Sequence, residues 1–227
     1  MAAALTLYMH PLSSYCWKAL IALYEVGAEF ECEVLQGRPA DDAAFRAMWP
    51  LAKMPVLKDA AQDKVVPEAS IIVEYLQSLY PNGPRLIPQS ADRALDVRLW
   101  DRVFDLHVQS PLQKIVSDYL RPEGDRDPAG VADARAALGV AYEFLETGVA
   151  AQGARDGFTL ADCAAVPALV YARAIRPFEP GQTELAAYFD RLLLRPSVQR
   201  TIREAKPFLQ WFPFHQGLDP RVLSGEF

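Results

Sequence analysis

The sequence is poor in the residues that usually hold metal ions and form disulfide bonds. Among its 227 residues there are only three cysteines and three histidines. Cys16, Cys32 and Cys163 do not have the spacing of metal ligands, and an odd number of cysteines is a poor disulfide framework. We therefore expect no bound metal and a reducing, cytoplasmic setting.

The chain also lacks an excess of basic residues and long apolar runs. Its 23 Lys and Arg residues against 29 Asp and Glu residues give a net charge of −6, which disfavours a nucleic-acid partner. No apolar run approaches the ~20 residues that span a bilayer, so we expect no membrane partner. The stretch MAAALTLYMH has no basic region, and its apolar run is too short for a signal peptide.

The first eighty residues alternate between strand and helix patterns. The apolar run at residues 4–9 predicts a buried strand, and helical spacing follows it over residues 13–27. FECEV (residues 30–34) alternates as a half-buried strand does, with Cys32 turned inward. Later patterns predict a helix at residues 41–49, two strands at 54–59 and 64–66, and a third helix at 68–81. The order βαβ, then ββα, predicts a small mixed sheet of the thioredoxin-like kind.

A proline-rich stretch separates this α/β part from a second part. YPNGPRLIPQSA carries three prolines and a glycine and is typical of a linker. Helical patterns dominate beyond it, and we find no convincing strand after residue 66. The sequence therefore predicts an α/β thioredoxin-like N-terminal domain at 1–80, a linker at 81–91 and an all-α helical domain at 92–227.

Two serines stand where the first strand turns into the first helix. Ser13 and Ser14 are good candidates for a helix N-cap, because a serine oxygen accepts from a free N–H of the first turn. The same free N–H groups also stabilise an anion such as a thiolate. Both interpretations stay open from the residues alone. Cys16, one turn into the helix, is typical of core packing.

Three further local patterns bear on structure or binding. Residue frequencies favour a trans peptide bond before Pro55, although a cis bond would suit a turn that presents backbone to a ligand. Glu68 and Ala69 open a helix and could stabilise it or hold a ligand. Thr159 and Asp162 have the spacing of a capping box, which we interpret as structural.

Five stretches occur in the order and at the spacing of one superfamily. They are LYMHPLSSYCWKALIALYE, MPVL, PEASIIVEYL, FTLADCAAVPAL and RPSVQR. Over residues 4–212 the chain resembles the cytosolic glutathione S-transferase superfamily. SSYCWK is most similar to the Ser-Ser-Cys-x-Trp-Arg motif of its serine-dependent, zeta-like end and related bacterial members. The resemblance implies glutathione as cosubstrate, conjugation of its thiolate to a small hydrophobic electrophile, and a homodimer.

The resemblance also implies roles for individual residues at the thiol. Ser13 matches the serine that donates a hydrogen bond to the glutathione thiolate, and Ser14 is the fallback. Donation alone shifts the equilibrium toward thiolate, so the serine need not lose its proton. The electrophile would lie between the domains, near His10 and the helical-domain aromatic residues Trp100, Phe104 and Tyr119.

The rest of glutathione would be held by backbone and charge. Met54 would pair its backbone with the cysteinyl part beside a cis Pro55, and Lys53 would contact the glycine end. Glu68 and Ala69 match the acid–serine pair that holds the γ-glutamyl group. Because Ala69 replaces the usual serine, one hydroxyl donor is missing. A net hydrogen bond is worth ~0.5–1.5 kcal/mol, so weaker affinity rather than its abolition is expected.

Three alternative functions remain. SSYCW permits glutathione-dependent cis–trans isomerisation, as in maleylacetoacetate isomerases, but residues 35–50 lack the basic-glutamine pattern of that group. Ala69 slightly favours a non-catalytic glutathione-binding module. A thiol–disulfide enzyme ranks low, because only the second sulfur position of the glutaredoxin Cys-Pro-Tyr-Cys motif, Cys16, is retained.

Overall fold

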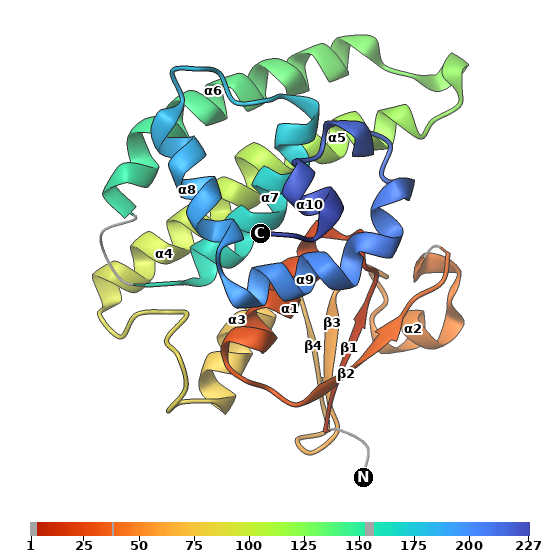
Figure 1. Ribbon diagram of the computed structural model, residues 1–227. Helices are drawn as coiled ribbons and strands as arrows, with labels where there is room; N and C mark the ends of the chain where they lie inside the picture. Colours follow the sequence, from red (N-terminus) through yellow and green to blue (C-terminus); the bar gives the residue numbers. More distant parts are fainter. Residues whose placement is uncertain (1–3, 38, 153–156) are drawn as a thin grey trace.

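A computed structural model describes residues 4–37, 39–152 and 157–227, and its N-terminal part is built on one four-stranded sheet (Figure 1). The strand order is β2-β1-β3-β4, with β1 parallel to β2 and antiparallel to β3, and β3 antiparallel to β4. This arrangement confirms the predicted thioredoxin-like sheet. The elements are β1 (Leu5–Met9), α1 (Ser14–Glu25), β2 (Phe30–Val34), η1 (Pro39–Asp41), α2 (Ala43–Met48), β3 (Val56–Asp59), β4 (Lys64–Pro67) and α3 (Ala69–Leu79).

The second part is helical throughout the residues described, and it packs over one side of the sheet-containing part (Figure 1). The first long helix passes through a π-helical turn, η2, before α5 begins. The elements are α4 (Ala91–Val103), η2 (Phe104–Gln109), α5 (Ser110–Tyr119), η3 (Glu123–Asp125), α6 (Pro128–Gln152), α7 (Leu160–Ile175), α8 (Thr183–Leu193), α9 (Pro196–Ala205), η4 (Lys206–Trp211), η5 (His215–Gly217) and α10 (Pro220–Ser224). None of the described helices is long and apolar enough to cross a membrane.

The helix starts follow from local side-chain chemistry. Ser13 is the N-cap of α1, and its Oγ accepts from the Cys16 N–H at 3.4 Å. At the start of α7, the Thr159 N–H and Oγ1–H both donate to Oδ2 of Asp162, at 2.7 and 2.8 Å. The predicted capping box is therefore confirmed, and it fixes where α7 begins.

Helix α1 lies at the centre of the contact between the two parts. It packs against α3 within its own part and against α7 and α9 of the helical part. Trp17 is fully buried, its ring centroid lies 5.2 Å from that of Tyr171, and its Nε1 donates to the Pro11 carbonyl. The larger of two apolar clusters therefore runs through both parts and packs them against each other.

Two of the three cysteines are buried. Cys16 and Cys163 are fully buried, in agreement with core packing. The prediction for Cys32 is wrong, because its side chain is exposed. Strand β2 lies at the edge of the sheet and its three central residues are exposed, so alternation of residue types did not indicate a buried face there.

Candidate functional site

A cavity of about 290 Å³, here called the first cavity, lies where the starts of α1 and α3 meet the loop before β3. The π-helical turn η2 and the end of α4 close it from the helical part. It is lined by Tyr15, Lys53, Met54, Pro55, Glu68, Ala69, Ser70, Arg102, Asp105 and Leu106. All five residues that the motifs predicted to bind the body of glutathione are in this list.

The loop before β3 borders the first cavity. The Met54–Pro55 peptide bond is cis, which corrects the trans bond favoured by residue frequencies and confirms the one implied by the resemblance. Met54 and Pro55 both line the cavity, and Lys53 lies beside them. The loop thus places a cis peptide bond and a lysine at the cavity.

Helix α3 begins at the cavity with an unusual backbone conformation. Glu68, the residue before α3, has φ +69°, although glutamate rarely adopts positive φ. Such a conformation costs on the order of 1–3 kcal/mol and is found mostly where a ligand or reaction requires it. The next residue, Ala69, lies in the first turn, where backbone N–H groups have no acceptor within the helix. Glu68 and Ala69 both line the cavity.

The start of α1 contributes an unexpected residue to the first cavity. Tyr15 lines it, whereas Ser13 is half-buried and Ser14 is 7% exposed, and neither is among the lining residues. Burial, followed by the charge of Asp105, raises the pKa of Tyr15, so its hydroxyl is a neutral donor. Burial also raises the pKa of the Cys16 thiol to about 12, which disfavours a thiolate at this cysteine.

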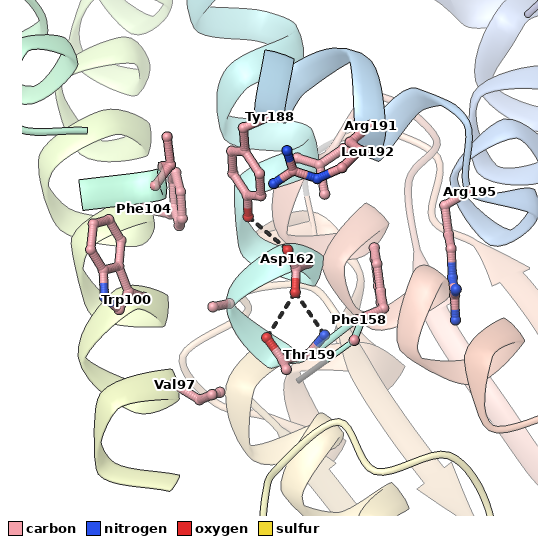
Figure 2. A pocket seen from close by; sticks show the side chains of 13 residues that line it. Val97, Trp100, Phe104, Phe158, Thr159, Asp162, Tyr188, Arg191, Leu192 and Arg195 are labelled. Carbon is pink, nitrogen blue, oxygen red and sulfur yellow. Dashed lines mark hydrogen bonds between the residues drawn. The ribbon is translucent and has the colours of Figure 1, made fainter. Parts of the chain in front are cut away.

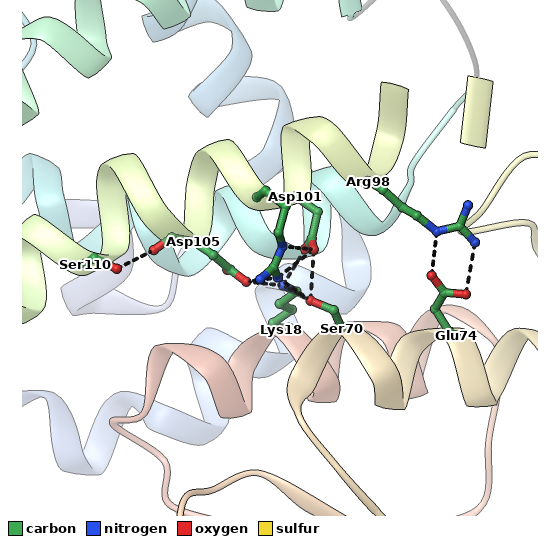
Figure 3. A network of polar contacts seen from close by, with 8 residues as sticks. Lys18, Ser70, Glu74, Arg98, Asp101, Asp105 and Ser110 are labelled. Atoms are coloured by element: carbon green, nitrogen blue, oxygen red, sulfur yellow. Dashed lines mark hydrogen bonds and ion pairs between the residues drawn. The ribbon is translucent and has the colours of Figure 1, made fainter. Parts of the chain in front are cut away.

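A network of charges, shown in Figure 3, shares Ser70, Arg102 and Asp105 with the lining of the first cavity. Lys18 on α1 is 1% exposed and forms ion pairs with Asp101 and with Asp105, the latter at 2.8 Å. Its Nζ also donates to Ser70 on α3 at 2.8 Å. Arg102 donates to Asp105 at 2.5 Å and to Ser70 at 2.7 Å. Polar contacts thereby join helices α1, α3 and α4 at the wall of the first cavity.

Sequence reasoning missed this network, although one signal was present. Lys18 stands alone among apolar residues in CWKALIAL, where a cation needs a buried partner. Its partners lie more than eighty residues later, on α4 and η2. Burial raises the pKa of Asp105, and the charge of Lys18 opposes that rise.

The four residues predicted for the electrophile do not come together. His10 lies with its ring 6.0 Å from that of Phe208, and burial lowers its pKa. Tyr119 is exposed and packs on Phe214, with ring centroids 5.2 Å apart. Trp100 and Phe104 line a different cavity, the second cavity, between α4 and α8. None of the four is among the residues that line the first cavity.

A thioredoxin-like domain with a cis-proline loop facing its ligand cavity, joined to an all-helical domain, defines a fold of the glutathione transferase kind. In agreement, residues 7–85 match the family described as glutathione S-transferase, N-terminal domain. The chain is 26% identical over 210 residues to glutathione S-transferase A from Pleuronectes platessa, covering 88% of this chain and 91% of that protein.

Solved structures agree with this match. A glutathione S-transferase from Methylobacterium radiotolerans in complex with glutathione sulfonate has a TM-score of 0.74 and 27% identity, over 87% of this chain and 93% of that one. A glutathione transferase from Phanerochaete chrysosporium with oxidized glutathione has a TM-score of 0.81 and 20% identity, over 92% and 98%. Together the comparisons support the glutathione S-transferase superfamily.

Proposed function

We propose that this protein is a glutathione transferase that conjugates the glutathione thiolate to a small hydrophobic electrophile. The observation that carries the proposal is the first cavity, where a cis-proline loop, the strained start of α3 and the start of α1 converge. Similarity to glutathione-bound structures supports the same ligand here. We further propose a serine-dependent enzyme of the zeta-like or related bacterial kind, on the basis of SSYCWK.

Each part of glutathione meets a group that suits its chemistry. The Glu68 carboxylate holds the γ-glutamyl ammonium, and the Ala69 N–H donates to the neighbouring carboxylate. The backbone of Met54, before the cis Pro55, pairs with the cysteinyl peptide group. Lys53 pairs with the glycine carboxylate. This assignment directs the sulfur toward the start of α1.

The start of α1 lowers the pKa of the glutathione thiol. The Ser13 hydroxyl donates to the sulfur, and the free N–H groups of the first turn stabilise its negative charge. The thiol proton leaves to solvent, the sulfur forms a bond to the electrophilic carbon, and a halide or similar group departs with its electron pair. We propose that the electrophile lies against Leu106, the exposed leucine in the cavity wall.

The first test replaces Ser13 by alanine and compares it with Ser14→Ala and Cys16→Ala. We expect Ser13→Ala to lower kcat/KM for an aryl chloride by about 10–100-fold, the effect of losing one hydrogen bond to a charged group. Its affinity for glutathione should change little, and the pKa of bound glutathione should rise in ultraviolet titrations. The other two variants should retain activity.

Several outcomes would redirect the proposal. Full activity of Ser13→Ala would remove Ser13 from the mechanism, and a loss in Ser14→Ala instead would transfer the role to Ser14. A glutathione-induced rise in melting temperature without conjugation would favour the non-catalytic binding module that Ala69 suggests. Isomerisation of maleylacetoacetate without net consumption of glutathione would identify the isomerase.

We also propose that the protein is a homodimer that joins through α3 and α4. Leu95 and Leu99 project from one face of α4 at a spacing of four residues, and each is more than half exposed, as is Ile71 on α3. Leu99→Glu should halve the mass measured by light scattering if a second copy covers this face. Leu120→Glu, an equally exposed leucine just beyond α5, is the matched control. An unchanged mass for Leu99→Glu would argue against this interface.

A further inference from the structure

The turn His10-Pro11-Leu12-Ser13 leads from β1 into α1. The Ser13 N–H donates to the His10 carbonyl at 2.9 Å, which closes the turn. Ser13 is also the N-cap of α1 and carries the hydroxyl that the proposed function assigns to the thiol. No residue of the turn is among those that line the first cavity or the second cavity, which Figure 2 shows. The turn therefore contributes to the proposed chemistry through the position that it gives Ser13.

Two side chains hold the interior of this turn. The indole Nε1–H of Trp17 donates to the Pro11 carbonyl at 2.6 Å, and the Leu12 N–H donates to Nδ1 of His10 at 3.2 Å. The second bond resembles an Asx-turn, in which a side-chain oxygen at the first position accepts from the backbone N–H two residues later. Leu12 is half-buried, so its N–H would lose free energy without this acceptor.

The His10 ring is neutral and packs against the C-terminal part of the chain. Its centroid lies 6.0 Å from that of Phe208 on η4, with an angle of 74° between the rings. Burial lowers the pKa of His10, so the imidazole is neutral at neutral pH and one of its nitrogens accepts a hydrogen bond. Because Nδ1 accepts from Leu12, the ring proton lies on Nε2.

We propose that His10 is a positioning residue for the glutathione thiolate, because it holds the turn that places Ser13. Its Nδ1 accepts from Leu12, and its backbone carbonyl accepts from Ser13 itself. His10 thus acts on the sulfur through the serine, without lining the first cavity. This inference rests on the proposed function, in which the Ser13 hydroxyl donates to the sulfur. Loss of the acceptor lets the serine move and lowers the fraction of thiolate.

Nitrogen-15 NMR of the intact protein tests the bond without reference to activity. At neutral pH the imidazole proton of His10 should lie on Nε2, and Nδ1 should have the chemical shift of an unprotonated nitrogen that accepts a hydrogen bond. The Leu12 amide should exchange with solvent about tenfold more slowly in the unchanged protein than in His10→Phe. A proton on Nδ1, or equal exchange in the two proteins, would overturn the inference.

Three variants separate the acceptor from the ring contact. His10→Phe keeps a ring beside Phe208 but has no acceptor. Its kcat for an aryl chloride should fall about threefold to tenfold at an unchanged KM for glutathione, and the pKa of bound glutathione should rise in ultraviolet titrations. His10→Asn provides an oxygen that accepts from the Leu12 N–H, so it should recover most of kcat. Phe208→Leu loses only the ring contact and should keep full kcat.

A double variant separates this inference from the proposed function. If His10 acts through Ser13, adding His10→Phe to Ser13→Ala should lower kcat further by less than about twofold. Full activity of Ser13→Ala would overturn the serine mechanism itself. Low activity of Ser13→Ala beside full activity of His10→Phe would overturn only the role of His10, as would a His10→Asn variant no more active than His10→Phe. Melting temperatures report whether each variant folds, and the position of the His10 proton is measured on the unchanged protein.

Discussion

The two faces of α4 border two cavities of opposite character. On one face, Arg102 leads into a buried ion-pair network that contacts α1 and α3 at the first cavity. On the other, Trp100 begins a row of rings at the second cavity. The polar residues of α4, and not its aromatic ones, therefore contact the thioredoxin-like part. A charged partner on α1 determines which face turns inward.

The largest effect is expected from removing the cation of the network. Lys18→Met removes the fully buried cation from Asp101 and Asp105 and leaves them only the half-exposed Arg102, which should reduce the free energy of unfolding by about 3–5 kcal/mol. Urea unfolding followed by circular dichroism measures this change. Arg98→Met breaks the exposed pair between Arg98 on α4 and Glu74 on α3, and should cost less than about 1 kcal/mol. Similar losses in the two variants would mean that the network does not organise α4.

A smaller effect is expected from disturbing the aromatic face. Gly148→Ala places a methyl group against the Trp100 ring, and overpacking of this kind costs about 1–3 kcal/mol. Tryptophan fluorescence should change, while the rise in melting temperature caused by glutathione should not. Gly124→Ala, where a Cβ meets no atom within 4 Å, is the control. A loss of glutathione binding in Gly148→Ala would show that the two faces are coupled.

The smallest effect concerns a single hydrogen bond at the second cavity. Burial raises the pKa of Asp162, and hydrogen bonds from Tyr188 and Thr159 oppose that rise. Tyr188→Phe should therefore raise this pKa further and cost about 1 kcal/mol at neutral pH. Tyr142→Phe is the control, because its buried hydroxyl has no hydrogen-bond partner in the described chain.

The sign of the pH dependence follows from the raised pKa. The folded state binds the Asp162 proton more tightly than the unfolded state does, so this group's contribution is most favourable below the ordinary pKa of about 3.8. The contribution of Asp162 to the free energy of unfolding falls as the pH rises through the raised pKa of its folded state. In Tyr188→Phe this loss of stability should extend to higher pH. Unfolding curves recorded at several pH values measure it. An unchanged profile would contradict this account.

Local features of the molecule were predictable from the sequence, and long-range ones were not. The Ser13 cap and the Thr159–Asp162 capping box depend on residues within one turn, so their spacing suffices. The motifs also predicted the residues of the cis-proline loop and of the α3 start that line the first cavity.

The placement of Trp100 and Phe104 depended on a contact made eighty residues away. Their helical spacing was consistent with either cavity, and only the pairing of Lys18 with Asp105 fixes which side they occupy. The π-helical turn at Phe104–Gln109 affects Tyr119 instead, because it shifts the residues beyond it around the helix axis. Regular periodicity in a sequence does not indicate such a turn.

The position of Lys18 also has a consequence for synthesis on the ribosome. The α/β part emerges first, with a lysine destined for its interior and both carboxylates still unmade. Until α4 has left the exit tunnel, α1 has no counter-ion to bury, so its packing is expected to wait for the second part of the chain. Translation and folding are thus linked by one ammonium group, because a product that ends at the linker lacks both carboxylates with which Lys18 pairs.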